Sequence, residues 1–295
     1  MIPLGPSITG TLVTSDLKGT VSAYCDFLSA SVYEDTQVIA EEAVLWGKPR
    51  LAGASVVTLV SPSGYPWGRV IGHPEVLPAK PFRELGWMAL EVLVADVDAL
   101  AQRLAQSPFE IFRAPANLDD SGDIRAMQVI GPAGEVLYLT QVNADVPPFQ
   151  VPQASCDVDR LFIPVSCCLR RDEGLAVYQK LGATQSWSFD TRIASINKAL
   201  DLHPEMRHPV ATVQLAGRSM VEIDQLGVAK PRPPGGGGFP AGIAMVSFLV
   251  DDLDALTIQP VSPPQALPGK LYRGQRVMVC RGAGGELIEL IQAVQ

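Results

Sequence analysis

The chain alternates between two hydrophobic periods, one typical of strands and one typical of helices. Short apolar runs with strand character begin each quarter of the chain, at residues 9–15, 88–94, 161–169 and 245–250. After the first run, apolar residues recur at intervals of four, three and four, which places them on one helical face: Leu17, Val21, Tyr24 and Leu28. The spacing predicts a helix here, with Ser15 as its N-cap.

The same order of elements follows the other three runs. Apolar residues at helical spacing are Val97, Leu100 and Leu104 in the second quarter, Leu175, Tyr178 and Leu181 in the third, and Leu253 and Leu256 in the fourth. Strand-like runs separated by glycine-containing turns come next and predict hairpins; in the first quarter they are residues 43–47 and 54–60. A strand, a helix and three strands, repeated four times, predict an α+β fold.

Two segments repeat each other almost residue by residue. Residues 124–139 (IRAMQVIGPAGEVLYL) match residues 275–290 (QRVMVCRGAGGELIEL) at a constant spacing of 151. We therefore expect two domains built on one plan. The N-terminal domain is placed at 1–145 (modules at about 8–62 and 86–142), a proline-containing linker at 146–158, and the C-terminal domain at 159–295 (modules at about 160–226 and 243–293).

Composition narrows the classes of function. The chain has 295 residues and a net charge of −8, without a basic face of the kind that binds nucleic acid. No run of about 18 apolar residues is present, so we expect no membrane span. The five cysteines form no Cys-x-x-Cys pair, which favours free thiols, a reducing compartment and a cytoplasmic protein.

The repeated pattern resembles the vicinal oxygen chelate superfamily, which includes glyoxalase I, bleomycin-resistance proteins and extradiol dioxygenases. The resemblance rests on a strand followed by Ser-Asp-Leu or Asp-Asp-Leu, a helix with Tyr24 or Tyr178, and the closing run GAGGELIEL at 282–290. It implies four βαβββ modules that form two glyoxalase-like domains with cupped mixed sheets, each around a small-molecule pocket. It also implies a small-molecule ligand as partner, and either a monomer or a homodimer.

Metal ligands in this superfamily come from the opening and closing strands of each module. By position, the resemblance places them at Thr9, Thr58, Ala89 and Tyr138 in the N-terminal half, and at Ile163, Glu222, Met245 and Glu289 in the C-terminal half. Divalent transition metals prefer imidazole, thiolate and carboxylate ligands, so neither set is complete. We therefore expect no metal and no other cofactor, although a divalent ion at the two glutamates stays open.

Glu222 and Glu289 are the candidate catalytic residues, since each is a lone carboxylate in an apolar strand. Burial in one pocket would raise a carboxyl pKa and suit a general base. The candidate ligand-binding residues are Tyr138, Thr9, Thr58, Ile163, Met245 and Trp67. Two functions stay open: lyase or isomerase chemistry on a small apolar or aromatic metabolite, and metal-free binding of such a molecule.

Overall fold

The computed structural model describes residues 4–76, 78–118, 121–233 and 238–293, and it confirms the predicted α+β class. The first module contains β1 (Ser7–Thr14), α1 (Leu17–Phe27), β2 (Ser31–Gln37), α2 (Ala40–Leu45), β3 (Ser55–Val60) and β4 (Gly68–Gly72). The second contains β5 (Gly86–Val94), α3 (Val97–Leu104), β6 (Glu110–Asn117), β7 (Ile124–Ile130) and β8 (Val136–Val142).

The second half repeats this order with one change. The third module contains β9 (Val158–Cys168), α4 (Arg171–Lys180), β10 (Gln185–Arg192), α5 (Ala194–Ala199), β11 (Arg207–Gln214) and β12 (Met220–Gln225). The fourth contains β13 (Gly242–Val250), β14 (Gln265–Ala266), α6 (Gly269–Tyr272), β15 (Arg276–Arg281) and β16 (Leu287–Gln292). The predicted helix at Leu253–Leu256 is wrong: these residues form a turn, and the β-branched Thr257 and Ile258 with Pro260 follow at once.

Two further local predictions are corrected in the first module. Asp16, rather than Ser15, caps α1, because its side chain accepts a hydrogen bond from the Gly19 amide at 2.9 Å. Residues 43–47, predicted as a strand, fall mostly in α2, whose first turn is closed by Glu42 accepting from the Ile39 amide at 3.0 Å. The last strand of the module is therefore β4, inside a segment without a strand pattern.

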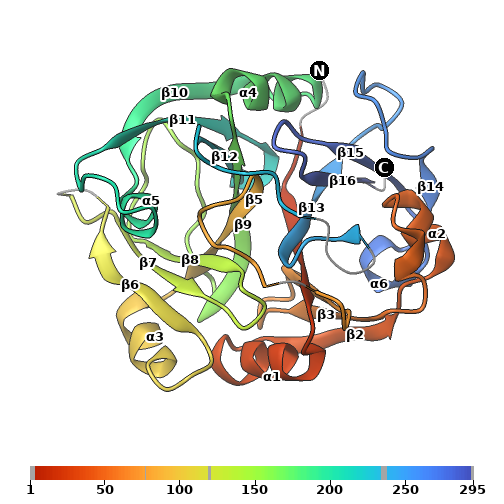
Figure 1. Cartoon of the computed structure of the whole chain (residues 1–295), viewed down its shortest axis with the longest axis horizontal. Coiled ribbons are helices and arrows are strands. Elements are labelled where there is room, and N and C mark those ends of the chain that lie inside the picture. The colour runs from red at the N-terminus through yellow and green to blue at the C-terminus, as the bar shows by residue number, and fades with distance from the viewer. Residues whose placement is uncertain (1–3, 77, 119–120, 234–237, 294–295) are drawn as a thin grey trace.

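The strands form two eight-stranded sheets that do not follow the two halves of the sequence. Sheet 1 has the order β14-β15-β16-β13-β1-β4-β3-β2, and sheet 2 has the order β10-β11-β12-β9-β5-β8-β7-β6. The first module therefore pairs with the fourth and the second with the third, so the expected closure of each cup within one half is corrected. Figure 1 shows the two sheets side by side, with red and blue strands in one and yellow and green strands in the other.

In each sheet, the two modules pair through their opening strands. β1 runs antiparallel to β13, with Thr11 opposite Met245, and β5 runs antiparallel to β9, with Ala89 opposite Val165. One face of both sheets packs on a shared core that includes residues of α1, α3 and α4. Gly10 marks a close approach between the sheets, because a Cβ there would lie 2.3 Å from a methyl carbon of Leu90.

Repeat-matched residues bind the two sheets to each other. The Tyr24 hydroxyl of α1 donates to Glu135 Oε1 in the β7–β8 turn at 2.6 Å, and the Ala133 amide donates to Glu135 Oε2 at 2.8 Å. The carboxylate folds back over Gly131, where a Cβ would lie 2.0 Å from Oε1. Glu286 has the same relation to Gly282, which explains why glycine and glutamate recur together in the repeat.

Among the described helices, the longest of which has 11 residues, none has the length and apolar character of a membrane-spanning helix.

We predict that Tyr24→Phe lowers the free energy of unfolding by about 1–3 kcal/mol, because it removes a hydrogen bond from a buried carboxyl group. Glu135 is 1% exposed, and burial raises its pKa to about 7. Urea unfolding followed by circular dichroism measures the effect. Tyr65→Phe is the matched control, since Tyr65 is 40% exposed, and it should stay within about 0.5 kcal/mol of the wild type. Equal stability of all three proteins would contradict this role of Tyr24.

Candidate functional site

The face of sheet 1 turned away from the shared core carries a separate apolar cluster, which includes Val13, Met245 and Leu287. Trp46, directly after α2, and Tyr272 of α6 belong to the same cluster and cover this face. We call this region cup 1. Its polar centre is formed by residues that are far apart in the sequence.

Glu289 of β16 lies fully buried in cup 1 and accepts four hydrogen bonds. Trp46 Nε1 and the Tyr272 hydroxyl each donate to Oε1 at 2.9 Å. Arg69 Nη2 lies 3.1 Å from Oε2, and the Ser247 hydroxyl donates to the same oxygen. These donors compensate the charged carboxylate and leave little capacity for accepting a substrate proton.

Arg69 of β4 is the counter-charge of Glu289 and is only 2% exposed. Its Nε donates to Thr11 Oγ1 at 2.9 Å, its Nη1 contacts the Tyr272 hydroxyl, and its guanidinium lies 5.0 Å from the ring centre of Trp46. Burial alone would lower the pKa of Arg69, but Glu289 and Tyr272 raise it above its ordinary value. The two closing strands of sheet 1 therefore contribute a buried ion pair.

A cavity of about 170 Å³ reaches this ion pair from the outside. Arg69, Thr58 and Tyr272 line it together with Glu34 and Glu42. Burial raises the pKa of Glu42, whereas Arg69 lowers it. The cavity thus offers both acidic and basic hydrogen-bonding groups to a small molecule.

The residues predicted for this site are distributed as follows. Thr58 lies opposite Arg69 and lines the cavity, but it belongs to β3 and not to the closing strand. Thr9 lies opposite Ser247, and its buried hydroxyl has no hydrogen-bond partner. Met245 is fully buried in the apolar cluster. Arg69 stands in the closing strand, and its guanidinium is bonded to Glu289, so these residues do not fit a divalent metal.

Cup 2 is the corresponding face of sheet 2. Its apolar cluster includes Ala89, Tyr138 and Val165, with Phe82 and Ile196 of the covering segments. Along one row of neighbouring strands, Trp187 lies opposite Thr212, Thr212 opposite Glu222, and Glu222 opposite Val165. Registered partners share a face of a sheet, so Glu222 points into cup 2 together with Tyr138.

Two further carboxyl groups lie on the same face. Asp224, two residues after Glu222 on β12, is fully buried, and Glu91 of β5 is 8% exposed. Thr140 Oγ1 donates to Glu91 Oε1 at 2.7 Å. None of the ion pairs among the described residues involves Glu91, Glu222 or Asp224. Cup 2 therefore concentrates acids without a counter-charge.

This arrangement raises the pKa of all three acids. Burial raises the pKa of Glu91 to about 8, and Glu222 contributes to the rise. Glu222 and Asp224 stand two residues apart on one face of β12, and burial is the main cause that raises the pKa of each. The charge of Glu222 raises the pKa of Asp224 further, so these two groups retain a proton near neutral pH. Burial also raises the pKa of Tyr138, which keeps its hydroxyl protonated.

Cup 2 does not present a metal-ligand set at the positions that the resemblance implies. Ala89 and Ile163 have no donor atoms, and the Tyr138 hydroxyl lies 3.4 Å from Ser195 Oγ. Within the described ranges, no three His, Cys, Asp or Glu side chains converge in a metal-binding arrangement. The absence of a metal or another cofactor stays a prediction.

The structure separates the predicted site residues and adds others. Glu222, Tyr138 and Ile163 belong to sheet 2, whereas Glu289, Thr9, Thr58 and Met245 belong to sheet 1. Trp67 is 1% exposed and packs in the shared core at 5.5 Å from the ring of Tyr24, so it faces neither cup. Sequence reasoning missed Arg69, Glu91 and Asp224. Glu91 is a lone charge in an apolar run, the signal that identified Glu222, whereas Asp224 shares its run with Glu222 and Arg69 lies in a segment rich in proline and glycine.

Comparison with known proteins shows the fold. No family model and no curated protein sequence matches the chain. Among solved structures, glyoxalase I from Zea mays is 14% identical, with a TM-score of 0.64, over 97% of this chain and 92% of that one. A candidate dioxygenase from Bacillus subtilis is 9% identical, with a TM-score of 0.61, over 98% of this chain and 86% of that one.

Both similarities extend over nearly the whole chain, so they include all four modules and both sheets. Identities this low establish architecture and not activity. The chain therefore shares the fold of glyoxalase I from Zea mays, an α+β architecture of four similar modules, as its repeated strand and helix pattern predicted.

Proposed function

We propose that this chain is a small-molecule enzyme that transfers protons in cup 2, as an isomerase or a lyase, with Glu222 as the general base. The observation that carries the proposal is that Glu222 and the buried Asp224 lie on one face of β12 without a counter-charge, and that the pKa of each is raised. A general base works best when its pKa lies near the working pH, and paired burial moves a carboxyl group toward that range.

The two carboxyl groups of the pair have different access. Glu222 is partly exposed, whereas Asp224 is fully buried beneath the same strand face. Glu222 is therefore the member that a substrate reaches, and Asp224 is a positioning residue that acts on the pKa of Glu222. Both carboxyl oxygens of Asp224 are buried without a hydrogen-bond partner, which favours the protonated form of this group.

The neighbouring hydroxyl groups suit an oxygen on which charge develops. Tyr138 stays protonated and is a donor, and the buried Thr212 hydroxyl opposite Glu222 has no hydrogen-bond partner. Glu222 would take a proton from the carbon next to a carbonyl group, and the electron pair would move onto the carbonyl oxygen. Where the deprotonated carbon carries a hydroxyl group, a proton shift between the two oxygens and return of the proton to the former carbonyl carbon give an isomer. Loss of a β-substituent with its bonding electrons gives an elimination product.

The lining of cup 2 also indicates the class of substrate. Uncompensated acids disfavour an anion, so the substrate is neutral or cationic. Trp187 lies in the row of Glu222, next to Phe149 at 5.1 Å, and Phe112 stacks on Phe82 at 5.2 Å. These rings favour a carbonyl compound with an apolar or aromatic part.

Metal-free binding in cup 1 is the second candidate function. The cavity of about 170 Å³ supports it, because it offers polar side chains to a ligand while all donors to Glu289 keep that carboxylate occupied. Under this alternative, Arg69, Thr58 and Tyr272 hold the ligand.

Exchange of substrate hydrogen for deuterium tests the enzymatic proposal. We predict that the protein catalyses carbon–deuterium exchange in D₂O in at least one compound of a panel of neutral aromatic and aliphatic carbonyl compounds, followed by proton NMR. Glu222→Gln should lower that rate at least about 100-fold, because it removes the base. Treatment with a chelator should leave the rate unchanged, since no residue of cup 2 completes a metal site.

Glu41→Gln is the matched control for this experiment, since Glu41 is exposed on α2 outside cup 2. Exchange that survives Glu222→Gln, or that the chelator abolishes, would overturn the proposal. A compound that raises the melting temperature without exchange, and loses this effect in Thr58→Val, would favour binding in cup 1.

Stability should fall as pH rises from about 4.5 to 8. The folded pKa of Glu91 is about 8 against an ordinary value of 4.5, so the native state binds more protons than the unfolded state between these values. Each such group changes the free energy of unfolding by at most about 1.4 kcal/mol per pH unit. Urea unfolding at several pH values measures this dependence. The free energy of unfolding should decline less steeply with pH in Glu91→Gln and in Asp224→Asn than in the wild type, and as steeply as in the wild type in Glu41→Gln. A steeper decline in both acid variants would be inconsistent with raised pKa values.

The ion pair of cup 1 should matter for stability rather than for proton transfer. We predict that Arg69→Met lowers the free energy of unfolding by about 3–5 kcal/mol, because it leaves a buried carboxylate unpaired. The double variant Arg69→Met, Glu289→Met should recover most of this loss, since apolar side chains then replace both charges. Urea unfolding measures both proteins. A double variant that is less stable than Arg69→Met alone would show that Glu289 does not depend on Arg69.

A further inference from the structure

A second cavity lies where the two sheets meet and borders cup 1, whose apolar cluster contributes Phe239, Ala244 and Leu287 to its lining. It has a volume of about 240 Å³, and its lining includes Lys48 after α2, Trp87 of β5, Phe239, Arg281 of β15 and the turn at Gly284–Gly285. Three of the four modules therefore contribute to it. An apolar cavity of about 150 Å³ accepts benzene, so this space is sufficient for a small aromatic molecule.

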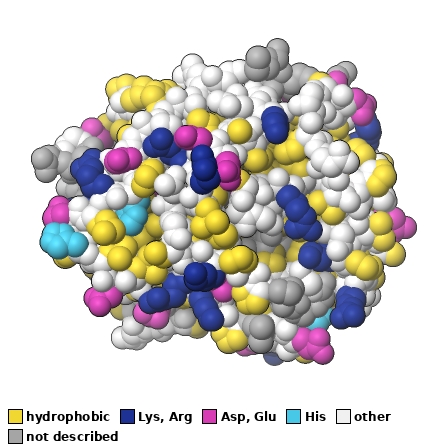
Figure 2. Space-filling view, turned by 45° about the horizontal axis from the view of Figure 1, so that its top comes forward, with side chains coloured by type: hydrophobic (Ala, Val, Ile, Leu, Met, Phe, Trp, Pro, Cys, Tyr) yellow, Lys and Arg dark blue, Asp and Glu magenta, His cyan; other side chains and the backbone are white. Residues whose placement is uncertain are grey.

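Two cations in this lining lack an acidic partner. Neither Lys48 nor Arg281 takes part in an ion pair among the described residues. Burial lowers the pKa of Lys48, and the charge of Arg281 lowers it further, so the two side chains are close enough to repel each other. An anion placed between them would remove this repulsion. On the face shown in Figure 2, lysine and arginine side chains lie across the middle and near the edges, some of them beside acidic side chains.

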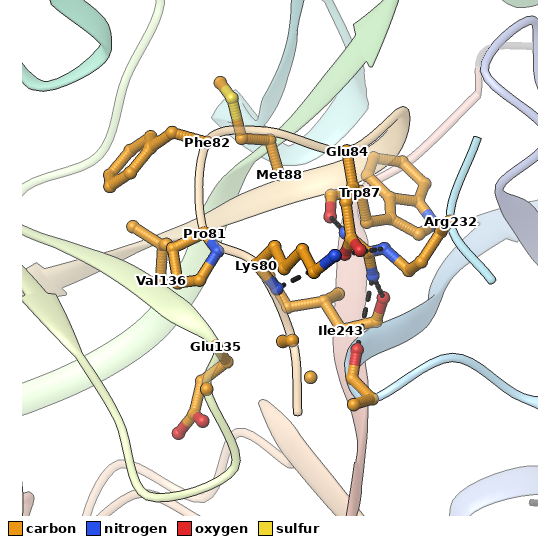
Figure 3. Close-up of a pocket in the computed structure, with 14 residues that line it drawn as sticks. Lys80, Pro81, Phe82, Glu84, Trp87, Met88, Glu135, Val136, Arg232 and Ile243 are labelled. Atoms are coloured by element: carbon orange, nitrogen blue, oxygen red, sulfur yellow. Dashed lines mark hydrogen bonds and ion pairs between the residues drawn. The ribbon is translucent and has the colours of Figure 1, made fainter. Parts of the chain in front are cut away.

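The third cation of the lining, Arg232, is already committed to the fold. Its Nη1 donates to the Ile243 carbonyl and its Nη2 to the Trp87 carbonyl, both at 2.6 Å, and its Nε lies 3.3 Å from Glu84 Oε2. Figure 3 shows these contacts, in which Arg232 joins the segment around Glu84 and Trp87 to β13. Arg232 thus holds one wall of the cavity in place, and Lys48 and Arg281 are the cations that can contact an anionic ligand.

The acidic residue of the lining, Glu286, does not neutralise these cations. Its carboxyl group folds back over the turn, where Oε1 would lie 2.0 Å from a Cβ at Gly282. Burial raises its pKa to about 7, so its charge is weakened near neutral pH.

Two buried aromatic rings support the apolar wall of the cavity, since Trp87 is 1% exposed and Phe239 is fully buried. Trp87 is held in place by its Nε1, which donates to the Leu287 carbonyl at 2.7 Å. Phe239 packs at 5.7 Å from Trp46, and Lys48 Nζ lies 5.9 Å from the Phe239 ring centre. We propose that this cavity binds a small aromatic carboxylate, with its charge between Lys48 and Arg281 and its ring against the apolar lining at Leu85, Pro231 and Pro240.

This site differs from cup 2 in charge, because cup 2 has uncompensated acids and this cavity has unpaired cations. The inference does not rest on the proposed enzymatic function, and either can fail alone. An aromatic acid bound here would also contact residues of both sheets, so we expect it to stabilise their association.

Calorimetric titration with 2-naphthoate tests the inference, with 2-naphthamide as the neutral compound of the same shape. We expect saturable binding of one naphthoate per chain and at least about tenfold weaker binding of the amide, since charged hydrogen bonds are lost. Lys48→Met and Arg281→Gln should each weaken naphthoate binding about tenfold. Arg281 is exposed, so its replacement keeps the fold and carries the test even if Lys48→Met is unstable.

Lys18→Met is the matched control, because Lys18 is exposed on α1 and has the same charge as Lys48. Its naphthoate affinity should equal that of the wild type. The inference is overturned if naphthoate shows no saturable binding up to about 5 mM. It is also overturned if the amide binds as tightly as the acid, or if both Lys48→Met and Arg281→Gln bind naphthoate like the wild type.

Discussion

The pairing of the first module with the last is the constraint on which the rest of the structure depends. β1 and β13 lie side by side although more than half of the chain separates them, and the second and third modules pair between them in the same way. Sheet 1 cannot form before the C-terminal quarter of the chain is present. Its central ion pair joins Arg69 to Glu289 across 220 positions of sequence. Each cup is therefore a property of the whole chain and not of one half.

Local patterns predicted the modules well, because the forces that set them act over short distances. The four opening strands and three of the four helices follow from hydrophobic spacing alone. The fourth helix fails because two residues at helical spacing are too few where a proline follows closely. The strand β4 has only five residues within a segment rich in proline and glycine, so no period marks it. Because the sequence pattern does not predict β4, the closing strand is placed at β3 and the ligand position at its residue Thr58. Arg69 is therefore missed.

The pairing of modules could not be predicted in the same way. A repeat shows that the modules are alike, and four similar opening strands can pair in more than one arrangement. The choice depends on non-local contacts such as Gly10 against Leu90 and Tyr24 with Glu135, which no local period reveals. The glycine–glutamate pairs of the repeat, at 131 and 135 and at 282 and 286, belong to turns beside the joint between the sheets. Their recurrence is explained by geometry rather than by chemistry on a substrate.

Divergence between the cups follows from what faces the closing-strand glutamate. In cup 1, Glu289 faces a guanidinium and three other donors, so its charge is compensated and its lone pairs are used. In cup 2, Glu222 faces Asp224 and a tyrosine, so its charge depends on pH and on whatever molecule approaches. A carboxylate paired with an arginine stabilises the fold, whereas neighbouring carboxyl groups that retain a proton can exchange this proton with a ligand. One scaffold position therefore serves two physical purposes in the same chain, and the partner residue, Arg69 or Asp224, decides which.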